Sequence, residues 1–204
     1  AMCGRYWIEF EIEDELRAIL EAALLLNPRM KTAGEIFPGD FAPVIAKNRR
    51  LERAAFPMLW DFPVFKGKSV INIRGETAGE KPAFQNSAKQ RRCAIPASWY
   101  FEWAVGEGGK KVKYRFFDQD GKTLYLAGLY TIAPNGAGFA VLTRPAEGIA
   151  AAVHHRMPAI IPKEAVEGWI FGEVQLEWLI YGKAPKLEFD LAEPETKTDD
   201  GGTR

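Results

Sequence analysis

Cysteine and histidine are rare in this chain of 204 residues, which contains two of each. Two cysteines, Cys3 and Cys93, cannot build the disulfide framework of a small secreted domain, so the sequence indicates a reducing cytoplasm. The two histidines are adjacent, at positions 154 and 155, and leave no ligand spacing typical of zinc. We therefore expect neither a metal nor another cofactor.

The chain also lacks long hydrophobic runs and a net charge. No apolar stretch reaches the length of about eighteen residues that a membrane helix needs, and no signal peptide is recognisable. Lys and Arg together number 27, as do Asp and Glu, so the overall charge selects no class of partner. We expect a soluble, cytoplasmic, monomeric protein with no membrane contact.

Basic residues are nevertheless concentrated in one part of the sequence. Between residues 47 and 92, eleven Lys and Arg stand against four Asp and Glu, a local excess of seven positive charges. Such an excess is typical of a surface that meets a phosphate backbone, although it is more often an ordinary solvated face. Charge alone does not decide between the two.

Apolar periodicity and turn signals indicate a sheet-rich fold with few helices. A helix is predicted over residues 13–28, where apolar residues recur at helical spacing and Asn-Pro ends the pattern. Residues 35–48, interrupted by Pro and Gly, predict a loop with a short strand. Further strands are predicted over 69–75, 92–103, 112–118, 123–130 and 138–144, and two short helices over 162–172 and 174–182. We expect a single α+β domain with a mixed, barrel-like β-sheet flanked by a few helices.

The two ends of the chain are expected to lie outside this domain. Residues 192–204 are polar and rich in turn formers, which predicts a loose tail. At the other end, Met2 looks like a natural initiator and Ala1 like a residue left by expression. The domain is then expected to span residues 3–191, and removal of Met2 would make Cys3 N-terminal.

An N-terminal cysteine has a distinctive reactivity. Its α-amine, with an ordinary pKa of about 7.7–8.0, and its thiol, with a pKa near 8.5, are carried by adjacent carbons. This pair can attack an aldehyde twice: the amine forms a Schiff base, and the sulfur then closes a five-membered thiazolidine ring. For an arbitrary cysteine, burial as a small hydrophobe is the more common role.

Three other polar residues interrupt apolar patterns, and each has two interpretations. Asn72 lies within a β-branched strand pattern and is either a satisfied buried amide or a functional one. Glu102 lies between two aromatic residues, where burial would raise its pKa as a general acid requires, unless strand alternation turns it to solvent. His154 could titrate near neutral pH or merely cap a loop.

Arginines and aromatic residues supply a further group of candidates. Arg5 and Arg74 suit bidentate contacts with phosphate, although exposed arginines often have no specific partner. The segment WDFPVFKG brings three aromatic residues close together among lysines, and these are Trp60, Phe62 and Phe65.

Four motifs follow one another along the chain: MCGR, INIRGET, RRCAIPASWYFEW and HHRMP. In this order and spacing they resemble the SRAP family, the SOS-response-associated peptidase proteins, which are also called abasic-site processing proteins. The resemblance extends from Cys3 to about Pro162. Members of this family crosslink themselves covalently to abasic sites in single-stranded DNA.

The resemblance implies a role for each candidate residue. Cys3 matches the nucleophile that forms a thiazolidine with the ring-opened deoxyribose, and Asn72 matches the asparagine that positions this cysteine and the sugar. Glu102 and His154 match the groups that support proton transfer. The implied DNA contacts are phosphate-binding arginines and an aromatic wedge that stacks on bases, namely Arg5, Arg74, Trp60, Phe62 and Phe65.

The implied function is that of a DNA-damage protein which senses abasic sites in single-stranded DNA and seals each as a thiazolidine crosslink, through Schiff-base chemistry of the lyase type. The residues ahead of Cys3 would first be removed, by an aminopeptidase or by the protein itself. One alternative is a cysteine peptidase with Cys3 as nucleophile and His154 or Glu102 as base. Another is a non-covalent single-strand binder in which Cys3 is only structural.

Overall fold

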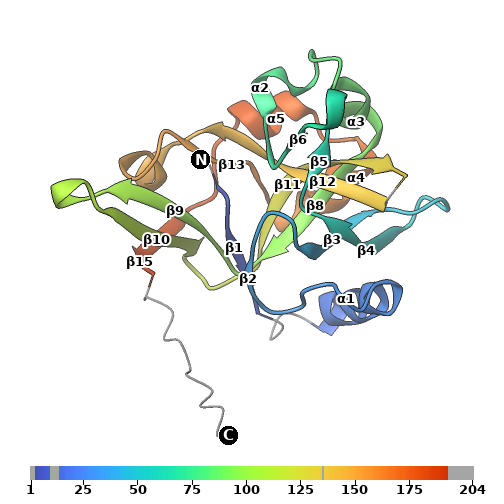
Figure 1. Ribbon diagram of the computed structural model, residues 1–204, viewed down its shortest axis with the longest axis horizontal. Coiled ribbons are helices and arrows are strands. Elements are labelled where there is room, and N and C mark those ends of the chain that lie inside the picture. Colours follow the sequence, from blue (N-terminus) through green and yellow to red (C-terminus); the bar gives the residue numbers. More distant parts are fainter. Residues whose placement is uncertain (1–2, 10–13, 135, 193–204) are drawn as a thin grey trace, which may run out of the picture.

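A computed structural model describes residues 3–9, 14–134 and 136–192 (Figure 1). The expectations for Ala1, Met2 and the tail beyond Ala192 lie outside the described residues.

Five strands close into a barrel. They pair in the order β12, β4, β3, β8 and β11, and β11 pairs again with β12 to complete the ring. Three short strands attach to β12 and β11: β13 and the parallel β7 to the first, β14 to the second. The bounds of these strands are β3 (Phe41–Lys47), β4 (Arg53–Leu59), β7 (Asn72–Arg74), β8 (Arg92–Ala97), β11 (Leu124–Ala133), β12 (Gly136–Pro145), β13 (Arg156–Pro158) and β14 (Ile160–Ile161). Because β12 pairs in parallel with β4 and β7 while the other pairings are antiparallel, the sheet is mixed, and the expected α+β fold with a barrel-like sheet is confirmed.

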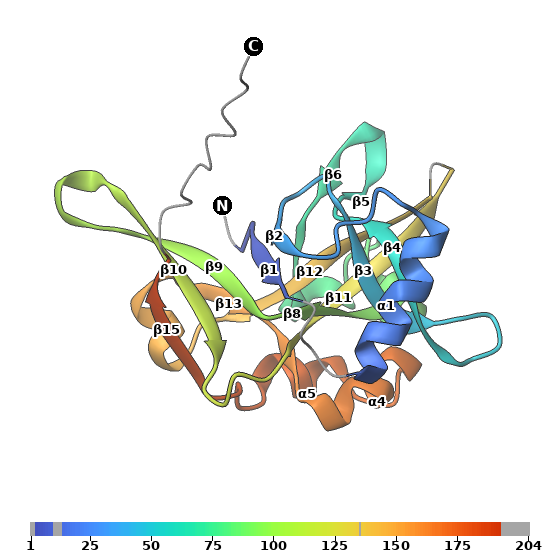
Figure 2. The ribbon, with the colours of Figure 1, turned by 90° about the horizontal axis from the view of Figure 1, so that it is seen from below.

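A second, antiparallel sheet extends from the barrel on the side opposite the β3–β4 hairpin (Figures 1 and 2). Its strands, in spatial order, are β15 (Leu187–Leu191), β10 (Lys111–Asp118), β9 (Trp99–Val105), β1 (Tyr6–Ile8) and β2 (Gly34–Ile36). The chain passes from the barrel into this sheet at Ser98, whose N–H donates to the carbonyl of Trp7 over 2.8 Å. The single strand predicted over residues 92–103 is therefore two strands in different sheets.

Helices cover the outside of the barrel. They are α1 (Asp14–Leu26), α2 (Gly75–Ala78), α3 (Gln85–Gln90), α4 (Val166–Phe171) and α5 (Leu176–Tyr181), with 3₁₀ turns η1 (Phe65–Gly67), η2 (Glu107–Gly109), η3 (Gly148–Ala152) and η4 (Lys163–Ala165). The predicted helices near residues 13–28, 162–172 and 174–182 are confirmed by α1, α4 and α5. Gly172 ends α4 in the left-handed region, with φ of 85°, and its N–H caps the carbonyls of Gly168 and Trp169. Within the described residues, no helix is long and apolar enough to cross a membrane.

Two segments differ from the sequence-based expectation. Residues 35–48 hold most of β2 and the whole of β3, which runs through Pro43; this residue lies opposite Pro57 of β4, so two residues without an N–H share one rung of the ladder. Residues 69–75 are not one strand but β6 (Ser69–Val70), which pairs with β5 (Phe62–Pro63), and then β7. Between β6 and β7, the carbonyl of Ile71 accepts the indole N–H of Trp60 over 3.0 Å.

The buried apolar side chains of the described residues form two clusters. One surrounds the fully buried Trp169 of α4, whose indole N–H donates to the carbonyl of Cys93 over 2.9 Å. The other lies between the barrel and the second sheet, around Tyr6, Trp60 and Phe139. Cys3 belongs to this second cluster.

Candidate functional site

Cys3 precedes β1 and is buried, with 1% of its surface exposed. Its backbone nitrogen donates to Oε1 of Glu102 over 2.5 Å. Because β1 pairs antiparallel with β9, with Tyr6 opposite Tyr100, the chain ahead of β1 runs back along β9 to Glu102. This pairing brings together two residues that lie 99 positions apart in the sequence.

Asn72 contacts Cys3 from the barrel. Its Nδ2 donates to the carbonyl oxygen of Cys3 over 3.3 Å. Asn72 begins β7, where it lies opposite Val141 of β12, so a barrel strand fixes its position. The structure therefore brings together three of the predicted residues, with the carboxyl group on the nitrogen of Cys3 and the amide on its carbonyl oxygen.

The carboxyl group of Glu102 has a strongly perturbed acidity. Burial raises the pKa of Glu102 from 4.5 to about 7, against the opposing effect of the backbone N–H groups of Cys3 and Trp103. At neutral pH the protonated and ionised forms coexist, so this group can both give and accept a proton.

The thiol of Cys3 is shifted in the same direction. Burial, and then the negative charge of Glu102, raise its pKa well above the ordinary value, against a smaller effect of the Arg5 backbone. The group is a neutral thiol at pH 7, and the thiolate that acts as a nucleophile forms only when a base removes the proton.

His154 lies in the segment between η3 and β13 and is half-buried. Its Nδ1 lies 3.1 Å from the backbone nitrogen of Arg156 and 3.2 Å from the carbonyl oxygen of the same residue, so it can accept or donate according to its tautomer. Its ring packs on that of His155, with centroids 4.4 Å apart. In the described part of the chain, the side-chain hydrogen bonds of His154 run to Arg156 and not to Cys3, Asn72 or Glu102.

Arg156 and Glu76 form a buried ion pair that the sequence analysis did not single out. Two hydrogen bonds join them, with Nη2 of Arg156 2.7 Å from Oε2 of Glu76, and Nη2 also donates to the carbonyl of Thr143 over 2.9 Å. The hydrogen bond from Arg156 lowers the pKa of Glu76. Glu76 lies in the motif INIRGET and Arg156 in the motif HHRMP. An acidic residue in one motif and a basic residue in another, both motifs that also hold candidate site residues, could have indicated this pair.

Arg5 lies in a cluster of cations and aromatic rings on the second sheet. Its guanidinium is 4.0 Å from the centroid of the Phe37 ring, and Nη1 lies 3.3 Å from Oε1 of the buried Glu35. Both oxygens of Glu35 also accept from Nζ of Lys113 over 2.8 Å. Arg5 is thus held by a carboxylate that it shares with a second cation, whereas Arg74 is exposed at the end of β7.

The three aromatic residues of the expected wedge are not equivalent. Trp60 is fully buried and stacked on Phe139, with centroids 6.1 Å apart, and Phe62 is buried with its ring edge-on to Phe84. Phe65, in η1, is 81% exposed. This corrects the expectation that Trp60 and Phe62 stack on bases, because a base cannot reach either ring; the role of Phe65 stays a prediction.

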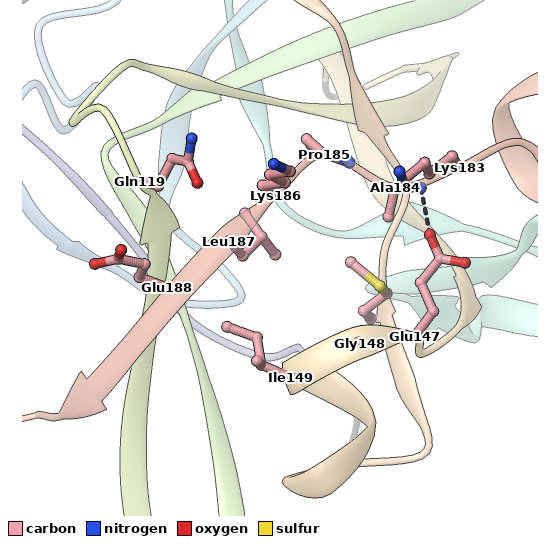
Figure 3. Close-up of a pocket in the computed structure, with 11 residues that line it drawn as sticks. Gln119, Glu147, Gly148, Ile149, Lys183, Ala184, Pro185, Lys186, Leu187 and Glu188 are labelled. Carbon is pink, nitrogen blue, oxygen red and sulfur yellow. Dashed lines mark hydrogen bonds between the residues drawn. The ribbon is translucent and has the colours of Figure 1, made fainter.

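A separate hollow of about 490 Å³ lies between η3, the start of β15 and the end of β10 (Figure 3). Glu147 lies at its rim, and its carboxylate accepts from the N–H of Ala184 and, over 3.3 Å, from Nη2 of Arg144. Cys3, Asn72, Glu102 and His154 do not line this hollow. Among the described residues, no group of three or more His, Cys, Asp or Glu could hold a metal ion.

The fold and the site together define an α+β barrel protein in which a cysteine ahead of the first strand is held by a buried acid and an amide. The chain belongs to the SOS response associated peptidase (SRAP) family, whose model matches residues 2–182.

Several curated proteins are similar to this chain. The abasic site processing protein YobE of Bacillus subtilis is 31% identical over 182 residues, which cover 83% of this chain and 82% of that protein. YoqW of the same organism, also named an abasic site processing protein, is 27% identical over 180 residues, with 83% and 80% covered. HMCES of Gallus gallus, again an abasic site processing protein, is 29% identical over 179 residues, which cover 67% of this chain and 53% of that protein.

Solved structures share the fold. A phage-related protein of Bordetella bronchiseptica superposes with a TM-score of 0.74 at 21% identity, covering 94% of this chain and 95% of that one. A protein of Bacteroides thetaiotaomicron superposes with a TM-score of 0.72 at 19% identity, covering 94% and 92%.

Proposed function

We propose that this chain recognises abasic sites in single-stranded DNA and bonds to them covalently through Cys3. The observation that carries the proposal is the 2.5 Å contact between the nitrogen of Cys3 and the carboxyl group of Glu102. Once the residues ahead of Cys3 are removed, that nitrogen becomes a primary amine beside a buried acid, whose pKa is raised to about 7 while those residues are present. The names of the relatives, all abasic site processing proteins, support the substrate.

The proposed reaction begins with the amine. The nitrogen of Cys3 adds to the aldehyde carbon of the ring-opened sugar and forms a carbinolamine. The protonated carboxyl group of Glu102 gives its proton to the new hydroxyl group, which leaves as water, and a protonated Schiff base remains. After removal of the residues ahead of Cys3, the amine and the acid lie together before the DNA binds.

The thiol completes the ring. The ionised Glu102 accepts the proton of the Cys3 thiol, and the sulfur adds to the Schiff-base carbon, whose C=N electron pair returns to nitrogen. The product is a five-membered thiazolidine, one water has been released, and Glu102 is again protonated. The hydrogen bond from Asn72 to the Cys3 carbonyl fixes the residue that carries both nucleophiles.

The DNA contacts follow from the residues around this centre. Arg74 is exposed two positions after Asn72 and would meet a phosphate flanking the sugar. Arg5, two positions after Cys3, is 34% exposed and would add a phosphate contact to the one that it makes with Glu35. Phe65 is exposed and can stack on a base. His154 would support proton transfer at the sugar through its Nε2, since Nδ1 is engaged with Arg156.

The same contact favours a second activity, removal of the preceding residues by the chain itself. The Cys3 nitrogen is the leaving group of the Met2–Cys3 peptide bond, and protonated Glu102 can donate to it as water adds to the Met2 carbonyl and the C–N bond breaks. This hydrolysis would act once on each chain and expose the amine that the crosslink requires.

The test uses protein that begins at Cys3 and single-stranded DNA with one abasic site, analysed on a denaturing gel. A heat-stable shifted band is expected, and it should be absent for chains that retain Met2. Cys3→Ser, which keeps the amine but lacks the thiol, should give a band only after borohydride reduction of the Schiff base. If DNA is bound but no band forms, the protein is a non-covalent binder. Mass spectrometry of a chain that begins at Met2, compared with its Glu102→Gln variant, tests self-cleavage.

A further inference from the structure

A groove of about 690 Å³ lies at the end of the barrel away from β9 and β10. It is bounded by the C-terminal end of α1, by the β3–β4 hairpin and by β11 with the start of β12, and both views place that hairpin at the far end of the molecule (Figures 1 and 2). Cys3, Asn72, Glu102 and His154 do not line it. The reaction proposed above makes no use of this groove.

The floor of the groove is apolar and accessible. Leu26 and Ile132 are 67% and 68% exposed, and Phe56 and Tyr130 are half-buried. Aliphatic side chains exposed together are unfavourable in water and mark interaction sites when they gather in one hollow. The two rings, Phe56 and Tyr130, are half-buried, whereas the most exposed side chains of the floor are the aliphatic Leu26 and Ile132. These aliphatic side chains suit the apolar side chain of a peptide better than the flat face of a nucleobase.

The rim of the groove is cationic. Lys47, Arg49 and Arg50 line it, and in the described part of the chain no carboxylate forms an ion pair with any of the three. Among the described residues that line the groove, the acid is Glu52, and it is engaged in the turn, because its Oε2 accepts from Nδ2 of Asn48 over 3.0 Å. Oδ1 of Asn48 also accepts the backbone N–H of Arg50 over 2.8 Å, which fixes the backbone of the turn that carries these cations.

We propose that this groove docks a short acidic segment of a partner protein, in which carboxylates lie next to a large apolar side chain. The apolar side chain would enter between Leu26 and Ile132, and the carboxylates would pair with Arg49 and Arg50 at the rim. Part of the basic excess between residues 47 and 92 then serves a protein partner instead of DNA. Since the groove and Cys3 lie apart, a docked partner leaves the Cys3 site open.

The proposal is tested by fluorescence anisotropy with a labelled peptide in which a run of Asp is followed by Leu and Phe. Arg49→Glu combined with Arg50→Glu should weaken binding at least tenfold and remove most of its salt dependence. Ile132→Ser should weaken binding similarly while the salt dependence stays. Ile132 is mostly exposed, so the fold should tolerate this change.

Matched controls separate this groove from the Cys3 site. A peptide with Lys in place of Asp, and one with Ser in place of Leu and Phe, should not bind. Crosslinking to abasic DNA should be unchanged in both groove variants. The proposal is overturned if the acidic peptide does not bind the native chain at millimolar concentration, or if it binds the variants equally well. It is also overturned if the variants lose affinity for undamaged single-stranded DNA instead, which would make the groove a DNA contact.

Discussion

Nη2 of Arg156 lies 2.7 Å from Oε2 of Glu76, although the two residues are 80 positions apart. Glu76 lies in α2, directly after the strand that begins at Asn72, and Arg156 begins β13, two residues after His154. The pair therefore ties the segment of His154 to the segment of Asn72. Because Arg156 is buried and Glu76 is only partly exposed, the tie is shielded from water and salt.

Replacing Glu76 by Gln leaves the charge of Arg156 buried without its carboxylate. We expect the free energy of unfolding to fall by about 3 kcal/mol at pH 7, measured by urea denaturation. The matched control is Asp120→Asn, which removes an exposed partner of Lys122 and should cause no measurable change. Equal effects of the two substitutions would contradict a structural role for the buried pair.

The same pair predicts a pH dependence. Arg156 lowers the pKa of Glu76, so the stabilisation is complete above the ordinary pKa of 4.5 and is lost as the pH falls through the lowered value. Glu76→Gln should therefore lose less stability on acidification than the native chain does. If the curves of unfolding free energy against pH ran parallel for the native chain and for Glu76→Gln, protonation of Glu76 would not contribute to stability.

The raised pKa of Glu102 gives the free energy of unfolding the opposite dependence on pH. Its pKa is raised to about 7, so protonation favours the folded state, and this stabilisation is full below pH 4.5 and lost as the pH rises through 7. We expect the native chain to lose about 3 kcal/mol from this group between pH 4.5 and 8, and Glu102→Gln to lack that loss. Chemical denaturation across this pH range measures both, and a native-like slope in the variant would refute the assignment.

Substitutions of Trp60 and of Phe65 are expected to affect different properties, stability in the first case and DNA binding in the second. Trp60→Ala should reduce the free energy of unfolding by about 3–5 kcal/mol, because it empties a packed site between Tyr6 and Phe139. Phe65→Ala should leave stability unchanged and weaken binding to single-stranded DNA about tenfold, as expected for the loss of one base stack. A Phe65→Ala variant with native DNA affinity would remove the last member of the expected wedge.

Gly138 lies where the backbone of a neighbouring segment leaves no room for a side chain. A Cβ there would lie 2.3 Å from the carbonyl oxygen of Asp61, so Gly138→Ala has to separate β12 from the start of β5. We expect a loss of about 3 kcal/mol in unfolding free energy. Gly79→Ala is the control, since its Cβ would meet only Leu176, at 4.0 Å, and it should be close to neutral.

Local sequence patterns singled out Asn72 and Glu102 as candidates, each with a second, structural interpretation, and did not predict their geometry. Asn72 and Glu102 were found because an amide and a carboxylate are out of place among β-branched and aromatic residues. Their convergence on Cys3 depends on the pairing of β1 with β9 and of β7 with β12, and no local pattern specifies such long-range pairings.

The errors have the same origin. Trp60 and Phe65 have similar neighbours in sequence, and tertiary packing decides which ring enters the core. Lys66, with φ of 61°, turns the chain just after Phe65, although no glycine marks that position. Pro43 contributed to the loop predicted over residues 35–48, but it lies inside β3, opposite Pro57 of β4.

The burial of Cys3 has a consequence for timing during protein synthesis. The ribosome makes Cys3 first and Glu102 99 residues later, which at about 5–20 residues per second leaves an interval of roughly 5–20 s. Until β9 emerges, β1 can pair with β2 but not with β9, and Glu102 is not yet there to accept from the nitrogen of Cys3. Under the proposed chemistry, an aminopeptidase would have to act on the nascent chain within this interval. If β9 pairs first, only the chain itself could still release the amine.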